Sequence, residues 1–144
     1  MRNRRFAVDA AMLVGLLCAV VLVSAPTFGQ TASKPDRAAI ERGKASFKES
    51  CAACHGETGR GNGPAAGAMK QRPTNLAVIA RERKGFPASE IQASIKGTSP
   101  VVAHGAPGMM VWGALFLADA NGNQAKADAR INDLVAFIES IQVK

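Results

Sequence analysis

Two cysteines and a histidine stand together at one place in the chain, in the order Cys51-Ala52-Ala53-Cys54-His55. Thiols separated by two residues lie on one turn of backbone, so both can add to the vinyl groups along one edge of a haem. The imidazole that follows can then reach the iron. Other uses of such a pair are a redox-active dithiol, a structural disulfide and half of a zinc site. A thioredoxin-like dithiol needs a βαβ context and a zinc site needs a second pair of ligands. The sequence shows neither, so one covalent haem is predicted.

Two amphipathic helices are expected to position this motif. Asp36 is placed to cap a helix that runs to about Ser50, and apolar or small residues recur along one of its faces, at Ile40, Gly43, Phe47 and Cys51. A second helix is predicted over about residues 127–142, with an apolar stripe formed by Ile131, Leu134, Val135, Phe137, Ile138 and Ile141. Two such helices bury their apolar faces against each other or against a shared centre.

The segment between these helices is predicted to be irregular. Residues 55–67 are rich in glycine, which indicates tight backbone wrapped around something. Short helices are expected over residues 64–71 and 75–81, and Ser89 is expected to cap one over residues 90–96. The sequence shows no internal repeat and few alternating β-branched runs, so an all-α domain is predicted. With no Tyr and one Trp, its side chains supply little bulk for a core.

The first 29 residues have the pattern of a secretory signal peptide. Arginines at three of the first five positions precede an uncharged apolar run over residues 10–25. This run of about 16 residues is shorter than the roughly 20 of a membrane-spanning helix, which favours cleavage near Gly29 or Ala32 over a retained anchor. Because the basic residues come first, the folded part, residues 30–144, is expected outside the cytoplasm, in the periplasm.

The composition also limits the class of partner. The chain has a net charge of +7, which falls to +5 when three arginines and one aspartate leave with residues 1–29. Basic residues are spread from Lys34 to Lys144 with no cluster interleaved with aromatic side chains, so nucleic-acid binding is not expected. The positive charge predicts redox partner proteins with acidic docking surfaces. Association with a membrane is expected only if the N-terminal segment is retained.

Over about residues 36–142 the chain resembles the class I c-type cytochromes of bacteria. The first matching segment is highly specific, and the others are individually weak but follow the family's order. They are Gly43-x-x-x-Phe47-x-x-x-Cys51-Ala52-Ala53-Cys54-His55-Gly56, Gly61-Asn62-Gly63-Pro64, Pro73-Thr74-Asn75-Leu76, Gly108-Met109-Met110-Val111-Trp112-Gly113 and Leu134-Val135-Ala136-Phe137-Ile138. The resemblance implies a small cytochrome c fold around one haem, with the terminal helices crossing at Gly43, Phe47 and Phe137.

The resemblance also implies the second axial ligand of the iron. In the family's pattern this methionine begins a Met-Pro-x-Trp-Gly segment. The matching residues here run from Met109 to Gly113, with Met110 where proline is usual. Met109 is therefore the expected metal ligand opposite His55. Met110, Met69 and His104 remain the alternatives.

Three further residues are given roles by the resemblance. The carbonyl group of Pro64 is expected to accept the second N–H of His55, which fixes the orientation of a ligating imidazole. Trp112 is expected to pack at the haem edge, where its N–H could reach a propionate, although plain core packing explains it equally well. Arg72 could pair with a propionate, but a solvated surface arginine is the better expectation.

Ligation by histidine and methionine leaves no open position on the iron, which predicts an electron carrier rather than an enzyme. A neutral thioether also favours ferrous iron and so a comparatively high potential. The expected function is a diffusible periplasmic carrier. The alternative is a haem c subunit of a larger oxidoreductase complex. A haem enzyme or gas sensor would require loss of the methionine ligand.

Overall fold

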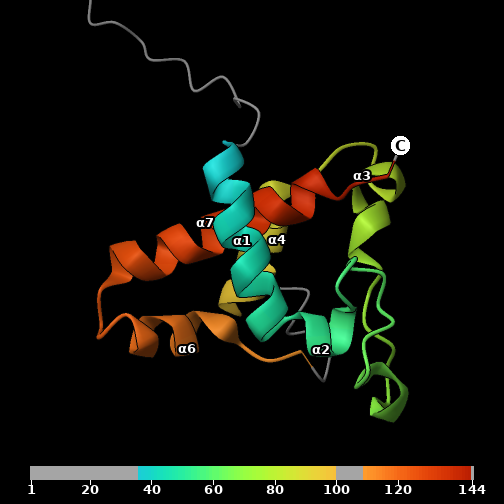
Figure 1. The fold of residues 1–144 in the computed structure, drawn as a ribbon, viewed down its shortest axis with the longest axis horizontal. Coiled ribbons are helices and arrows are strands. Elements are labelled where there is room, and N and C mark those ends of the chain that lie inside the picture. Colours follow the sequence, from blue (N-terminus) through green and yellow to red (C-terminus); the bar gives the residue numbers. More distant parts are fainter. Residues whose placement is uncertain (1–35, 100–108, 144) are drawn as a thin grey trace, which may run out of the picture. The chain divides into compact units, whose positions relative to one another are not determined.

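The computed structural model describes residues 36–99 and 109–143, and all regular elements in these ranges are helices (Figure 1). The all-α class is therefore confirmed. In chain order the elements, with η marking short 3-10 turns, are α1 (Arg37–Ser50), α2 (Ala52–His55), η1 (Ala66–Ala68), η2 (Leu76–Val78), α3 (Ile79–Glu82), α4 (Ala88–Lys96), α6 (Trp112–Asp119) and α7 (Gln124–Ser140). Within these ranges no helix has the length and apolar character needed to cross a membrane. The predicted signal segment lies outside the described residues.

The two terminal helices form as predicted. α1 ends at Ser50, and Asp36 occupies its N-cap position, although the aspartate side chain makes no capping hydrogen bond. α7 starts three residues earlier than expected, because the side chain of Asn123 accepts a hydrogen bond from the backbone N–H of Lys126 and caps the helix there. The buried side of α7 consists of Ala127, Ile131, Leu134, Val135, Phe137 and Ile138.

α1 and α7 cross in close contact, as Figure 1 shows (cyan and red). Gly43 lies against the backbone of α7, so closely that a Cβ at this position would collide with the carbonyl oxygen of Asp133. Next to it the rings of Phe47 and Phe137 meet with their centroids 5.0 Å apart. The crossing at Gly43, Phe47 and Phe137 is thus confirmed. Arg42 adds a bidentate ion pair with the carboxylate of Asp133, at 2.7 and 2.9 Å.

Two shorter helices pack against α7. α4 begins at Ala88 with Pro87 as its N-cap residue, so the predicted cap at Ser89 is wrong. It ends at Gly97, whose left-handed backbone (φ 79°, ψ 18°) suits a residue without a side chain. α6 was not predicted from the sequence.

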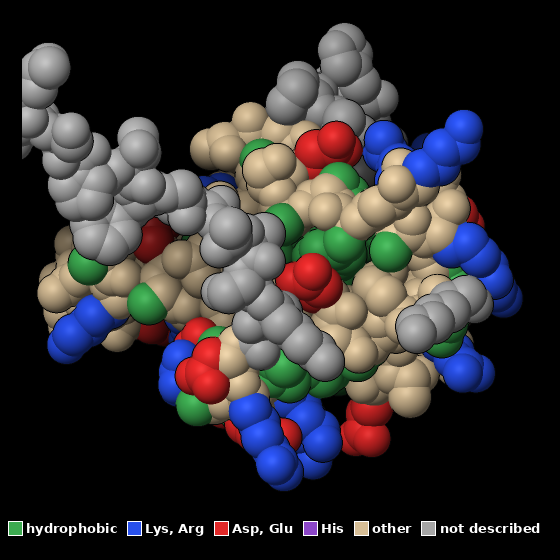
Figure 2. Space-filling model, turned by 90° about the horizontal axis from the view of Figure 1, so that it is seen from above, with side chains coloured by type: hydrophobic (Ala, Val, Ile, Leu, Met, Phe, Trp, Pro, Cys, Tyr) green, Lys and Arg blue, Asp and Glu red, His purple; other side chains and the backbone are tan. Residues whose placement is uncertain are grey.

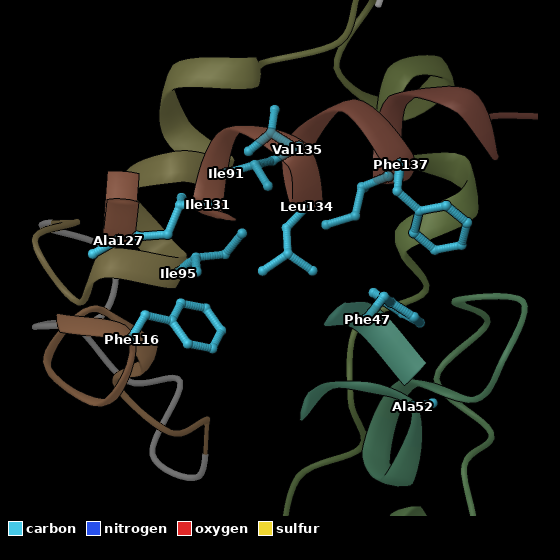
Figure 3. Close-up of a cluster of buried hydrophobic side chains, with 11 residues drawn as sticks. Phe47, Ala52, Ile91, Ile95, Phe116, Ala127, Ile131, Leu134, Val135 and Phe137 are labelled. Carbon is cyan, nitrogen blue, oxygen red and sulfur yellow. The ribbon is translucent and has the colours of Figure 1, made fainter. Parts of the chain in front are cut away.

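The core lies among these four helices. Figure 3 shows side chains from α4, α6 and α7 pointing toward one another, with Phe47 of α1 and Ala52 of α2 at one edge. The largest fully buried side chains are Phe47, Phe116, Ile131 and Leu134. Burial of a side chain of this size contributes about 1.5–3 kcal/mol to folding, so this cluster is the main source of stability outside the cofactor site.

The segment between α2 and α4 is mostly irregular, as predicted, but its helices are shorter. The predicted helix over residues 64–71 is reduced to the single turn η1, and the one over residues 75–81 is divided into η2 and α3. Asn75 caps η2, because its side chain accepts a hydrogen bond from the backbone N–H of Ala77 at 3.1 Å.

Candidate haem site

One cavity of about 370 Å³ brings together most of the residues predicted to bind the cofactor. This volume falls in the usual range of cofactor sites, about 300–1,000 Å³. The cavity is lined by Glu49, Ser50, Cys51, Ala53, Cys54, His55, Met69, Gln71, Arg72, Pro73, Thr74, Met109, Met110 and Trp112. Pro64 is not among these residues and is exposed.

The end of α1 and the single turn of α2 hold the cysteine motif. The backbone N–H of Cys51 donates to the carbonyl oxygen of Phe47 at 2.8 Å, and that of His55 donates to the carbonyl oxygen of Cys51 at 2.9 Å. Backbone hydrogen bonds on both sides of Cys51 therefore place both thiols and the imidazole on one turn that follows the buried Phe47. All three side chains line the cavity.

Neither cysteine forms a disulfide, so both thiols are free and partly buried. Burial raises the pKa of the Cys51 thiol to about 11, whereas the nearby positive charge of Arg130 acts to lower it. The described residues contain no group of three or more His, Cys, Asp or Glu side chains suited to a metal ion.

The orientation of His55 is fixed by a carbonyl group other than the one expected. Its Nδ1 atom lies 3.0 Å from the carbonyl oxygen of Thr74, so the prediction for Pro64 is wrong. The chain around Pro64 is held elsewhere, because the N–H groups of Gly63 and Ala65 donate to carbonyls of the cysteine motif at 3.1 and 2.9 Å.

The protonation state of His55 suits an axial ligand. Burial lowers its pKa and the bond to Thr74 partly opposes this, so the imidazole is neutral at neutral pH. With Nδ1 donating to Thr74, Nε2 is left for the iron.

Several contacts fix the backbone that carries Thr74. The N–H of Leu76 donates to the carbonyl oxygen of Gly59 at 2.6 Å. The side-chain amide of Gln142, just beyond α7, donates to the carbonyl oxygen of Leu76 and accepts from the N–H of Ala80, at 2.7 and 2.8 Å. The C-terminal end of the domain therefore supports the segment whose Thr74 carbonyl group meets His55.

Met109 and Met110, called the methionine segment below, form another part of the cavity wall. Met69, Met109 and Met110 all line the cavity, whereas His104 lies outside the described residues. Met109 is 38% exposed and Met110 is 57% exposed, so Met109 is the more enclosed of the adjacent pair.

Close packing between α4 and α6 holds the segment that follows these methionines. The side chain of Val111 lies against Gly97, at the end of α4. At the start of α6, Gly113 lies so close to Lys96 that an added Cβ would be 2.7 Å from its carbonyl oxygen. Trp112, between these contacts, stacks on Phe116 with a centroid distance of 5.5 Å and an interplanar angle of 27°.

The family model for cytochrome c matches residues 40–142, most of the chain. The chain belongs to the cytochrome c family. Searches among curated proteins and among solved structures found no match. Family membership and the spacing of Cys51 and Cys54 assign one covalent haem c to this cytochrome and make it a haem c electron carrier.

The residues present fit that cofactor. The cavity offers two free thiols on one turn, an imidazole whose Nδ1 is already engaged, and methionine sulfurs in its wall. Arg72 lines the same cavity while remaining exposed, so it has access to both the cofactor site and solvent. When bound, haem c supplies a one-electron couple between ferric and ferrous iron.

Proposed function

We propose that this cytochrome is an exported, freely diffusing one-electron carrier, with haem attached at Cys51 and Cys54 and its iron held between His55 and Met109. The observation that carries the proposal is that these side chains line one cavity, although Met109 is far from the others in the sequence.

Each residue has a distinct part in this function. The two cysteines hold the cofactor permanently, so it is not lost between successive partners. His55 supplies Nε2 to the iron while Thr74 keeps its ring in place. Met109 supplies a neutral sulfur, which favours the ferrous state and fills the last coordination position. A filled position keeps dioxygen and peroxide from the iron, which favours electron transfer over catalysis.

Electrons would leave and enter through the surface beside the cavity. Met110, Val111 and Leu115 are exposed hydrophobic residues, 40–57% accessible, on or next to the methionine segment. A few exposed hydrophobic residues suit the small, transient interfaces of redox partners. On the face of the molecule drawn in Figure 2, basic and acidic side chains are interspersed around hydrophobic ones. Charge steering by this surface is therefore expected to be modest.

Export to the periplasm rests on the N-terminal sequence, with three early arginines followed by an uncharged apolar run. We propose that residues 1–29 are a signal peptide and that residues 30–144 are the mature cytochrome. Covalent attachment outside the cytoplasm would then follow export of the unfolded chain.

Substitution of the two adjacent methionines tests the ligand assignment. Met109→Ala is expected to abolish the sulfur-to-iron charge-transfer absorption of the oxidised protein and to open the reduced protein to carbon monoxide. Met110→Ala is the matched control and should retain the absorption. If Met110→Ala alone removes it, the ligand is the next residue. If neither change affects it, Met69 becomes the ligand to test, because it lines the same cavity.

The alternative is a haem c subunit of a larger oxidoreductase complex. The same exposed hydrophobic residues beside the cavity are equally consistent with it, because a permanent partner would cover them. Migration of the native protein on a sizing column distinguishes the two functions. A free carrier elutes at the size of a monomer, whereas a subunit elutes with a catalytic chain.

A further inference from the structure

Arg130 of α7 is held behind the wall of the haem cavity. Its guanidinium donates to Ser46 and Glu49 of α1, at 3.2 and 3.1 Å, and to Asp119 of α6, at 3.2 Å. Its carbon centre lies 4.2 Å from the centroid of the Phe116 ring. The side chain is only 28% exposed, so this cation is partly shielded from solvent.

Arg130 is connected to the cavity wall through two of its contact residues, Glu49 and Phe116. Glu49, one of its partners, is itself a lining residue. Phe116, the ring under its guanidinium, stacks on Trp112, which also lines the cavity. A charge in this position acts on the cavity through protein, where it is screened less than it would be in bulk water.

The charge of Arg130 lies close to the segment that would carry the haem. Its partner Glu49 stands two residues before Cys51, and both residues line the cavity. Cys51 is one of the two proposed attachment points of haem, so the cation is one residue removed from the wall at the edge of the cofactor.

We propose that Arg130 raises the reduction potential of the bound haem, while its partner Glu49 lowers it. The proposal rests on the proposed function, since it requires haem attached in this cavity. Reduction adds one electron, taken from the redox partner, to the iron and neutralises one positive charge there. A nearby cation favours the reduced state and a nearby carboxylate favours the oxidised state. Arg130 is thus a positioning residue. Its charge changes the reduction potential, and with it the driving force for electron transfer, without contact with the iron.

The expected shift is moderate, because two carboxylates accompany the cation and part of the site is exposed. Replacing Arg130 by methionine should lower the equilibrium constant for reduction about threefold to tenfold, where tenfold corresponds to 59 mV for one electron. Arg130→Lys keeps the charge but loses the fork of hydrogen bonds, so it should retain most of the potential and lose stability. Glu49→Gln should shift the equilibrium in the opposite direction.

The matched control is Arg42→Met. Arg42 also joins α1 to α7, through Asp133, but neither Arg42 nor Asp133 lines the cavity, whereas Glu49, the partner of Arg130, does. This variant should lose stability without changing the potential.

The experiment is a spectroelectrochemical titration of each purified holoprotein, with urea unfolding measured in parallel. The proposal is supported if Arg130→Met lowers the potential, Glu49→Gln raises it, and Arg130→Lys and Arg42→Met leave it nearly unchanged. It is overturned if Arg130→Lys lowers the potential as much as Arg130→Met, or if Arg42→Met has the same effect. Should Arg130→Met fail to fold, an unchanged potential in the exposed Glu49→Gln variant overturns it. Wild-type protein without covalent haem would instead contradict the proposed function.

Discussion

Replacing Gly113 by alanine would test whether packing of α6 on α4 holds the methionine segment at the iron. The added Cβ would lie 2.7 Å from the carbonyl oxygen of Lys96 and 3.0 Å from its Cα atom. Ordinary van der Waals contact begins at 3.4 Å, so the helices must separate by about 0.7 Å at this point. Because the obstructing atoms belong to the backbone, no side-chain rotation relieves the clash. Met109, just before α6, would move with the helix.

The size of the effect follows from this geometry. Overpacking of this kind costs about 1–3 kcal/mol, and alanine in place of glycine returns up to about 1 kcal/mol by restricting the unfolded chain. The net loss is about 1–2 kcal/mol. With Met109 as the ligand proposed above, carbon monoxide would bind the ferrous iron only when the methionine sulfur has left, so its apparent affinity would follow the population of that state. Weakening the sulfur-bound state by about 1–2 kcal/mol raises the affinity about 5- to 30-fold.

The assay is a carbon monoxide titration of the reduced protein, followed by haem absorption, together with urea unfolding. Gly67→Ala is the matched control, because its added methyl group would meet nothing within 4 Å. We expect higher affinity for carbon monoxide in Gly113→Ala and wild-type affinity in Gly67→Ala. The reasoning is refuted if Gly113→Ala loses the expected stability but binds carbon monoxide like the wild type. The packing would then stabilise the fold without holding the ligand.

Three other outcomes are expected. Replacing both Cys51 and Cys54 by alanine should release the haem into acidified organic solvent, and haem that stays with the polypeptide would contradict covalent attachment at these residues. The rate of electron transfer to an acidic partner should fall modestly as the salt concentration rises. The reason is that screening shortens the reach of the mature protein's charge to about 8 Å at physiological ionic strength. A rate that stays flat or rises with salt would point to hydrophobic docking. Mass spectrometry of exported protein should give a chain beginning near Gln30 or Ser33, whereas an intact N-terminus would show a retained anchor.

The elements with a clear sequence period were predictable. α7 carries an apolar stripe on one side only, and α1 combines an N-cap position with apolar or small residues along one face. α6 has no such period, because apolar residues occur nearly all round it, so its sequence does not separate a buried face from an exposed one. Its helical state depends instead on packing against α4 and α7.

Those residues of the candidate site that belong to a recognisable sequence motif could be predicted. The cysteine motif, Met109 and Trp112 were named from pattern, and they line one cavity. Which carbonyl meets His55 was not predictable, because the path of the loop depends on contacts far apart in the sequence. Thr74 directly precedes the cap residue Asn75, and bonds from Gly59 and Gln142 hold the chain just after that cap. Arg130 gave no sequence signal, since its partners come from two other helices, α1 and α6, that are far from it in the sequence.

The contact between α1 and α7 also sets an order of events in the life of the chain. Arg42 and Asp133 are 91 residues apart, so the first helix lacks its main packing partner, α7, until nearly the whole domain has been synthesised. Cys51 and Cys54 follow α1 directly, so in the export that we propose they would reach the periplasm long before α7 does. During that interval the thiols stand on a segment that no core yet covers, which gives haem access to them. Closure of α7 onto α1 would then come last and complete the hydrophobic core beside a cofactor that is already attached.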